Sequence, residues 1–137
     1  MNKINSVLLV DDDEATNFIS TLIIKRAGIA NELLTARNGK DAIELLKNIE
    51  SGDASAAGKA PNLILLDINM PVMDGFGFLQ AYQKLDFPGK ESVVIAVLTT
   101  SLNPRDEDLV KKAGVLDFLN KPLTGKVLEE LLAKHFN

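Results

Sequence analysis

The sequence predicts an α/β protein built on one doubly wound sheet of five parallel strands. Five short apolar runs alternate with five segments whose apolar residues recur at helical spacing. Runs such as NLILLD (62–67) and SVVIAVLTT (92–100) are apolar at successive positions, which is typical of parallel strands covered on both faces. Right-handed crossovers then favour an open sheet between two helical layers. The 137 residues suit one domain, 1–137.

The first half of the chain is expected to supply three strands, at 3–10, 31–36 and 62–67. The helix after the first strand ends at Gly28, and these residues mark it at helical spacing: Ala15, Phe18, Ile19, Leu22 and Ile23. The next helix is marked by Ala42, Leu45, Leu46 and Ile49. Residues 51–60 (SGDASAAGKA) are small and polar without a period, so we expect a surface loop inserted there.

The second half is expected to supply a helix at 75–85, strands at 92–100 and 115–119, and a last amphipathic helix at 124–136. Asn103 and Pro104 are typical of an N-cap and a first helical position, so they predict the start of a further helix, which Gly114 ends. We expect the single histidine, His135, to be solvated.

Composition excludes several classes of protein. The chain has no cysteine, which rules out disulfides, thiolate metal sites and cysteine nucleophiles. The net charge of −4 and the scattered lysines and arginines give no basic stripe, so direct binding to nucleic acid is not expected. The N-terminal apolar run is too short for a signal peptide or a membrane span. We therefore expect a cytoplasmic protein without a membrane contact.

Charged and hydroxyl side chains follow four of the expected strands. In chain order they are Asp11, Asp12 and Asp13; Asp67; Thr99 and Thr100; and Lys121. Because the carboxyl ends of parallel strands open on one edge of the sheet, we expect these groups to meet in one shallow cleft. Asp13 is better explained as a helix cap.

A hard divalent cation would relieve this crowding of acids. Two carboxylates about 4 Å apart repel by about 1 kcal/mol in water and about 4 kcal/mol at a protein surface. Magnesium prefers an all-oxygen site, whereas zinc would want histidine or cysteine ligands. Such a site beside a free aspartate and a lysine suits phosphoryl transfer, in which a carboxylate can be the nucleophile.

The chain resembles response-regulator receiver domains of two-component signalling over nearly its whole length. Four segments carry the resemblance in the family's order: LLVDDDE, LILLDINMPVMDG, VIAVLTTS and LDFLNKPL. The resemblance implies a flavodoxin-like (βα)5 fold with strand order 2-1-3-4-5. It also implies a stand-alone receiver, because the chain ends soon after the last helix, although the 51–60 loop is longer than most receivers carry.

The resemblance also implies a role for each matching residue. Asp67 matches the phosphoacceptor and Lys121 the lysine that pairs with the phosphoryl oxygens. Asp11, Asp12 and the backbone carbonyl of Asn69 match the groups that hold Mg²⁺ together with Asp67. Thr99 matches the switch hydroxyl, and the 22-residue step to Lys121 favours it over Thr100. Phe118 stands at the aromatic switch position of the fifth strand, where an ordinary core role is the competing interpretation.

The function implied is that of a signalling receiver rather than an enzyme. A histidine kinase or histidine phosphotransfer protein would phosphorylate Asp67, and the surface of the fourth helix, fifth strand and fifth helix would change toward a downstream protein. A monomer or a phosphorylation-dependent dimer is expected. Two alternatives stay open: a metal-dependent aspartyl phosphatase, although Asn69 replaces its usual second acid, and a receiver-fold binding module that is not phosphorylated.

Overall fold

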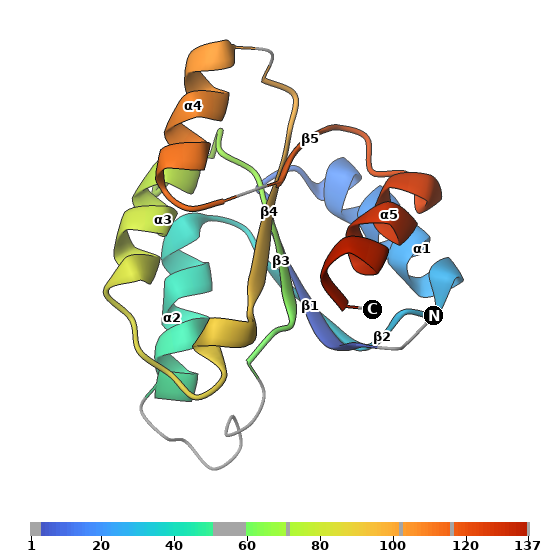
Figure 1. Ribbon diagram of the computed structural model, residues 1–137, viewed down its shortest axis with the longest axis horizontal. Helices are drawn as coiled ribbons and strands as arrows, with labels where there is room; N and C mark the ends of the chain where they lie inside the picture. Colours follow the sequence, from blue (N-terminus) through green and yellow to red (C-terminus); the bar gives the residue numbers. More distant parts are fainter. Residues whose placement is uncertain (1–3, 51–59, 71, 102, 116, 137) are drawn as a thin grey trace.

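A computed structural model describes residues 4–50, 60–70, 72–101, 103–115 and 117–136 of the chain. Five parallel strands form one sheet in the order β2-β1-β3-β4-β5 (Figure 1). The strands are β1 (Ile4–Val10), β2 (Ala30–Ala36), β3 (Leu63–Leu66), β4 (Val94–Thr99) and β5 (Asp117–Asn120). The predicted fold class and strand order are confirmed.

Helices cover both faces of the sheet, as Figure 1 shows. One layer consists of α1 (Glu14–Ala27) and α5 (Gly125–Phe136). The other consists of α2 (Gly39–Glu50), α3 (Gly75–Gln83) and α4 (Pro104–Lys112). Successive residues of a strand point to opposite faces, so Leu8 and Val10 belong to the core under α2 and α3, while Val7 and Leu9 belong to the core under α1 and α5. This is why the strands are apolar at consecutive positions.

Helix ends follow the capping residues seen in the sequence. The side chain of Asp13 accepts a hydrogen bond from the Ala15 amide at the start of α1, and Gly28 ends that helix with a φ of 62°. Asn103 caps α4, whose first residue is Pro104. Differences are confined to edges: α3 ends at Gln83, and a short 3-10 helix, η1 (Lys90–Ser92), occupies the start of the segment expected to be β4.

Helix α1 presents its apolar row to the outside. Phe18, Ile19 and Leu22 are 65%, 46% and 38% exposed, whereas Ser20 and Ile24 are buried against the sheet. The spacing predicted the helix correctly, but the helix packs Ser20, Ile23 and Ile24 toward the sheet and leaves Phe18, Ile19 and Leu22 outside. Phe18, Ile19 and Leu22 therefore form an apolar strip on the surface of α1.

The expectation that His135 is solvated is wrong. His135 is half-buried, and its Nε2 lies 2.7 Å from Oδ2 of Asp117 at the start of β5. Lys134 places its Nζ 2.9 Å from the other oxygen of the same carboxylate. The two bonds lower the pKa of Asp117 even though its burial acts in the opposite direction. They fasten the end of α5 to the sheet.

Most of the expected 51–60 loop, residues 51–59, lies outside the described residues. Within the described part of the chain, every helix is too short or too polar to cross a lipid bilayer.

Candidate functional site: acidic residues and a lysine at the carboxyl edge of the sheet

The pairing of β1 with β3 places two aspartates side by side. Val10 is opposite Leu66 in the ladder, so the next residues, Asp11 and Asp67, leave the two strands at the same level. The Asp67 amide donates to the Val10 carbonyl at 2.9 Å, and the Asp11 amide donates to the Ala36 carbonyl of β2 at 3.0 Å. Both carboxylates are therefore anchored by backbone that continues the sheet.

Lys121 reaches this pair from β5. Thr99 is opposite Asn120 in the ladder, and the Lys121 amide donates to the Thr99 carbonyl at 2.9 Å. The Lys121 Nζ lies 2.6 Å from Oδ2 of Asp11 and 3.3 Å from Oδ2 of Asp67. The side chains of Lys121, Asp11 and Asp67 are only 12%, 7% and 6% exposed, so water screens these contacts weakly.

Asp12 completes a group of three carboxylates. One oxygen from each of Asp11, Asp12 and Asp67 lies within 4.8 Å of the others, and Asp12 is the exposed member. Three carboxylates and the Lys121 ammonium carry a formal charge of −2, which one divalent cation would neutralise. An all-oxygen donor set of this kind fits Mg²⁺ or Ca²⁺ and lacks the nitrogen and sulfur ligands that zinc prefers.

The electrostatics differ between the members of the cluster. Burial raises the pKa of Asp11, and the Asp67 carboxylate adds to the rise; the Lys121 ammonium and the Asp13 amide, at 2.9 Å, oppose it. Burial alone would lower the pKa of Lys121, but its bonds to Asp11 and Asp67 outweigh burial and raise it. Lys121 therefore stays charged, and a further cation would stabilise the ionised form of Asp11.

The remaining predicted residues surround this cluster at different depths. Thr99 is fully buried and its Oγ1 accepts the Ser101 amide at 3.1 Å, whereas Thr100 is exposed. Asn69 is exposed, and its amide lies 3.3 Å from Oδ1 of Asp67. Phe118 is half-buried and packs against the α2–α4 core, opposite Val97 of β4.

The residues that meet directly are thus the three aspartates and Lys121, and Asn69 reaches Asp67 through its amide. Among the residues that the structure describes, Thr99 contacts the cluster through its carbonyl, which accepts a hydrogen bond from the Lys121 amide.

Sequence reasoning missed one supporting residue. Asn17 of α1 donates from its side-chain amide to the Asp11 carbonyl at 2.9 Å, which ties the first helix to the acidic loop. Its position, one helical turn after the cap Asp13, was the available signal, but only the tertiary structure shows which face of α1 looks at the sheet. The cavity that Asp11 and Asp67 line measures about 10 Å³, room for one water-sized group.

Comparisons with known proteins all point to one family. Residues 7–133 match the family model described as "Response regulator receiver domain". The chain is 35% identical over 129 residues to Two-component response regulator 24 of Arabidopsis thaliana, covering 94% of this chain and 82% of that protein. The crystal structure of a two-component response regulator from Cytophaga hutchinsonii superposes with a TM-score of 0.86 at 34% identity and covers 99% of both chains.

A third comparison is with the crystal structure of the phosphorylated cyanobacterial phytochrome response regulator RcpA, at a TM-score of 0.74 and 26% identity. It covers 96% of this chain and 90% of that one.

Proposed function

This chain belongs to the family of response regulator receiver domains, and we propose that it accepts a phosphoryl group on Asp67 from a histidine kinase or a histidine phosphotransfer protein. The observation that carries the proposal is the position of Asp67, whose Oδ2 faces the Lys121 ammonium while two further carboxylates lie within reach of one cation. The similar regulator RcpA is phosphorylated in its crystal structure, which supports the same chemistry here. We take residues 1–137 as one receiver unit.

Asp67 would act as the nucleophile. A carboxylate oxygen of Asp67 forms a bond to phosphorus while the bond from phosphorus to the donor's histidine nitrogen breaks, which leaves an acyl phosphate on Asp67 and a free imidazole on the donor. Lys121 lies where it can neutralise a phosphoryl oxygen, and the Asn69 amide orients the other carboxylate oxygen of Asp67.

The carboxylates of Asp11, Asp12 and Asp67 would hold Mg²⁺, and the Asn69 carbonyl is the further ligand that the family resemblance implies. The ion, when bound, offsets negative charge on the transferred group.

Phosphorylation of Asp67 would then change the surface of the protein. A phosphoryl group adds negative charge and acceptor oxygens beside Thr99, whose hydroxyl is bonded only to the Ser101 amide among the described residues. Thr99 would turn toward the phosphoryl group, Phe118 would follow into the space it leaves, and the surface of α4, β5 and α5 would change for a downstream protein partner. The shift is limited by how much better Thr99 and Lys121 bond in the modified state.

The surface of α1 supports a protein rather than a metabolite as the phosphodonor. Its apolar strip of Phe18, Ile19 and Leu22 begins one turn after the acidic loop of the site. Exposed apolar groups gathered beside a reactive group are typical of a protein contact. We do not expect nucleic acid at this face or a membrane partner, and we place the protein in the cytoplasm.

The aspartyl phosphatase alternative is less well supported. Asn69 stands where such enzymes have a second acid, and an amide cannot serve as the proton donor. The chain should release essentially no product from a chromogenic phosphate ester.

Intact mass measurement after incubation with acetyl phosphate and Mg²⁺ tests the proposal. The native protein should gain one phosphoryl group, and Asp67→Asn should gain none. Asp108→Asn on the exposed side of α4 is the matched control and should be labelled like the native protein. A label that persists in Asp67→Asn, or labelling that is unaffected by removal of Mg²⁺ with a chelator, would overturn the assignment.

A further inference from the structure

The backbone on each side of Asp12 is held by a hydrogen bond. The Asn17 side-chain amide donates to the Asp11 carbonyl at 2.9 Å, and this carbonyl belongs to the peptide unit that leads into Asp12. The Asp13 amide, in the peptide unit that leaves Asp12, donates to Oδ1 of Asp11 at 2.9 Å. Because a peptide unit is planar, a bond at one end fixes the orientation of the whole unit. Asp12 thus stands between two anchored peptide planes.

Asp12 needs this support more than its two acidic neighbours do. Lys121 pairs with Asp11 and Asp67, and both of these carboxylates are buried. Asp12 is exposed, and it forms no ion pair among the residues that the structure describes. One of its oxygens nevertheless lies within 4.8 Å of an oxygen of each of the other two carboxylates, where like charges repel. The anchored backbone opposes this repulsion, because it sets the direction in which the Asp12 side chain leaves the chain.

Asn17 acts from a rigid element. Its backbone amide donates to the Asp13 carbonyl at 3.0 Å, and Asp13 in turn caps α1 by accepting the Ala15 amide. The Asn17 side chain is half-buried and lines the small cavity that Asp11 and Asp67 also line. A side chain on a helix holds its target more precisely than one on a loop. The bond to the Asp11 carbonyl is therefore a fixed part of the site.

We propose that Asn17 is a positioning residue for the divalent cation: by holding the Asp11 carbonyl, it keeps the Asp12 carboxylate within reach of the ion without touching the ion itself. The inference rests on the proposed metal site of Asp11, Asp12 and Asp67. Groups that orient a metal ligand typically change metal affinity by about 10–100-fold. Asn17 acts on the backbone beside the ligand rather than on its carboxylate, so we expect a change at the low end of this range.

Titration of the ¹⁵N-labelled protein with Mg²⁺, without a phosphodonor, measures the effect through the amide signals of Asp12, Asp13 and Asn69. Asn17→Leu keeps the size of the side chain and removes the donor, and Asn17→Ala removes both; each should weaken Mg²⁺ binding about tenfold. Alanine favours a helix more than asparagine does, which offsets the lost bond, so the urea midpoint of Asn17→Ala should stay close to that of the native protein. Unchanged affinity in both variants, or no Mg²⁺ binding by the native protein, would overturn the proposal.

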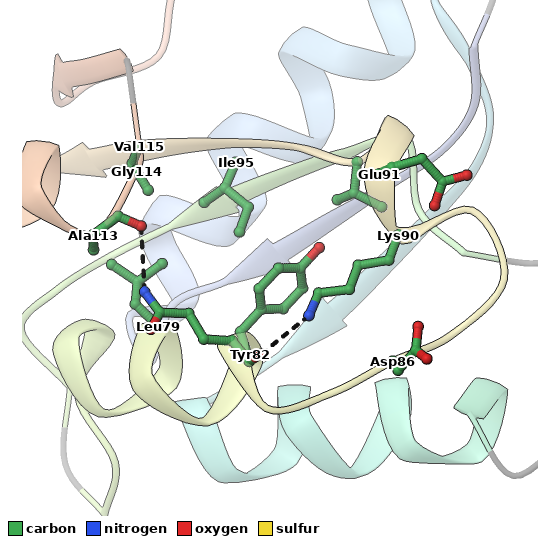
Figure 2. A pocket seen from close by; sticks show the side chains of 11 residues that line it. Leu79, Tyr82, Asp86, Lys90, Glu91, Ile95, Ala113, Gly114 and Val115 are labelled. Atoms are coloured by element: carbon green, nitrogen blue, oxygen red, sulfur yellow. Dashed lines mark hydrogen bonds between the residues drawn. The ribbon is translucent and has the colours of Figure 1, made fainter.

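Gln83 supplies a matched control. Its side-chain amide reaches the Ala113 carbonyl at 3.5 Å, also a contact from a helical side chain to a backbone carbonyl, which Figure 2 shows as the dashed line at Ala113. Gln83 ends α3, about 12 Å along the helix from its first residue, Gly75, which lies beside Asp67. Gln83→Ala should therefore leave Mg²⁺ affinity unchanged within twofold. A tenfold loss in this variant would mean that any such contact affects the metal, and would refute a specific role for Asn17.

A double-mutant cycle tests whether Asn17 acts through Asp12. Asp12→Asn alone should weaken Mg²⁺ binding, and adding Asn17→Leu should weaken it by less than a further twofold, because no carboxylate remains to be positioned. A further tenfold loss in the double variant would show that the two residues act independently and would contradict the proposal.

Labelling with acetyl phosphate gives a second readout of the same role. Asn17→Leu should need about tenfold more Mg²⁺ for the half-maximal rate and should reach the native rate at saturating Mg²⁺. A lower rate at saturation with an unchanged half-maximal concentration would contradict the positioning role. The titration needs no phosphodonor, so a failure of Asp67 to be labelled would refute the proposed function and leave the result of the titration standing.

Discussion

Gly75, the first residue of α3, should not tolerate even a methyl group. A Cβ atom there would lie 2.6 Å from the Cα of Ile68 and 2.8 Å from the Asp67 carbonyl oxygen. These neighbours are backbone atoms, and the Gly75 amide also donates to the Ile68 carbonyl at 3.1 Å. We therefore expect Gly75→Ala to push the start of α3 away from the backbone of Asp67, the proposed phosphoacceptor.

The magnitude follows from opposing effects. Overpacking costs about 1–3 kcal/mol, and contact with backbone at two points favours the upper end. Alanine regains at most about 1 kcal/mol of helix propensity. The net loss in free energy of unfolding should be about 2 kcal/mol, or a fall of about 6 °C in Tm. The rate of labelling by acetyl phosphate should also fall, because the Asp67 backbone has to move.

Two other glycines provide matched controls for the urea unfolding measurement. Gly125, the first residue of α5, has no heavy atom within 4 Å of an added Cβ, so Gly125→Ala should be neutral or slightly stabilising. At Gly77 the nearest atom is the flexible Met73 side chain at 3.0 Å, so Gly77→Ala should cost well under 1 kcal/mol. If Gly75→Ala unfolds no earlier than Gly125→Ala, the steric reasoning is wrong.

Further predictions concern other surfaces. The bonds from Lys134 and His135 lower the folded pKa of Asp117, so the stability that they give should be complete above the ordinary pKa of 3.8 and lost as the pH falls through the lower folded pKa. Asp117→Asn should therefore lower the unfolding free energy by about 1–2 kcal/mol at pH 7 and by almost nothing at the acid end of a series of urea unfolding measurements. Phe18→Ser should change the unfolding free energy by less than about 0.5 kcal/mol, yet slow transfer from a phosphorylated protein donor and not from acetyl phosphate; equal slowing with both donors would contradict the role of α1. Asn103→Ala should lower the unfolding free energy by about 1 kcal/mol in the same urea assay, through loss of the α4 cap, and an unchanged midpoint would count against that cap.

Local patterns were sufficient to predict the sheet and the meeting of Asp67 with Lys121. Strands apolar on consecutive positions can only be buried between two layers, and parallel strands end at one edge. The orientation of α1 was not predictable in the same way, because Phe18 and Leu22 define an apolar row without saying whether the row faces the sheet or the solvent. The pairing of His135 with Asp117 depends on how α5 crosses the sheet, which no local signal records.

The finer geometry of the acidic edge was also beyond the sequence. Resemblance pairs Lys121 with a phosphoryl group on Asp67, yet in the structure its nitrogen is nearer to Asp11 than to Asp67. Differences of less than 1 Å between two adjacent carboxylates arise from strand twist and side-chain rotamers, and a one-dimensional pattern does not encode them.

Lys121 lies between the Asp11 and Asp67 carboxylates and acts as an internal counterion to them. Because Lys121 offsets part of the negative charge of the cluster, removal of the metal with a chelator should leave the domain folded but prevent phosphorylation of Asp67. An entering divalent cation has to compete with the Lys121 ammonium, which is tethered to the chain, and this competition should weaken the affinity of the site for the metal. We therefore expect the centre to bind a divalent cation weakly and to exchange it readily.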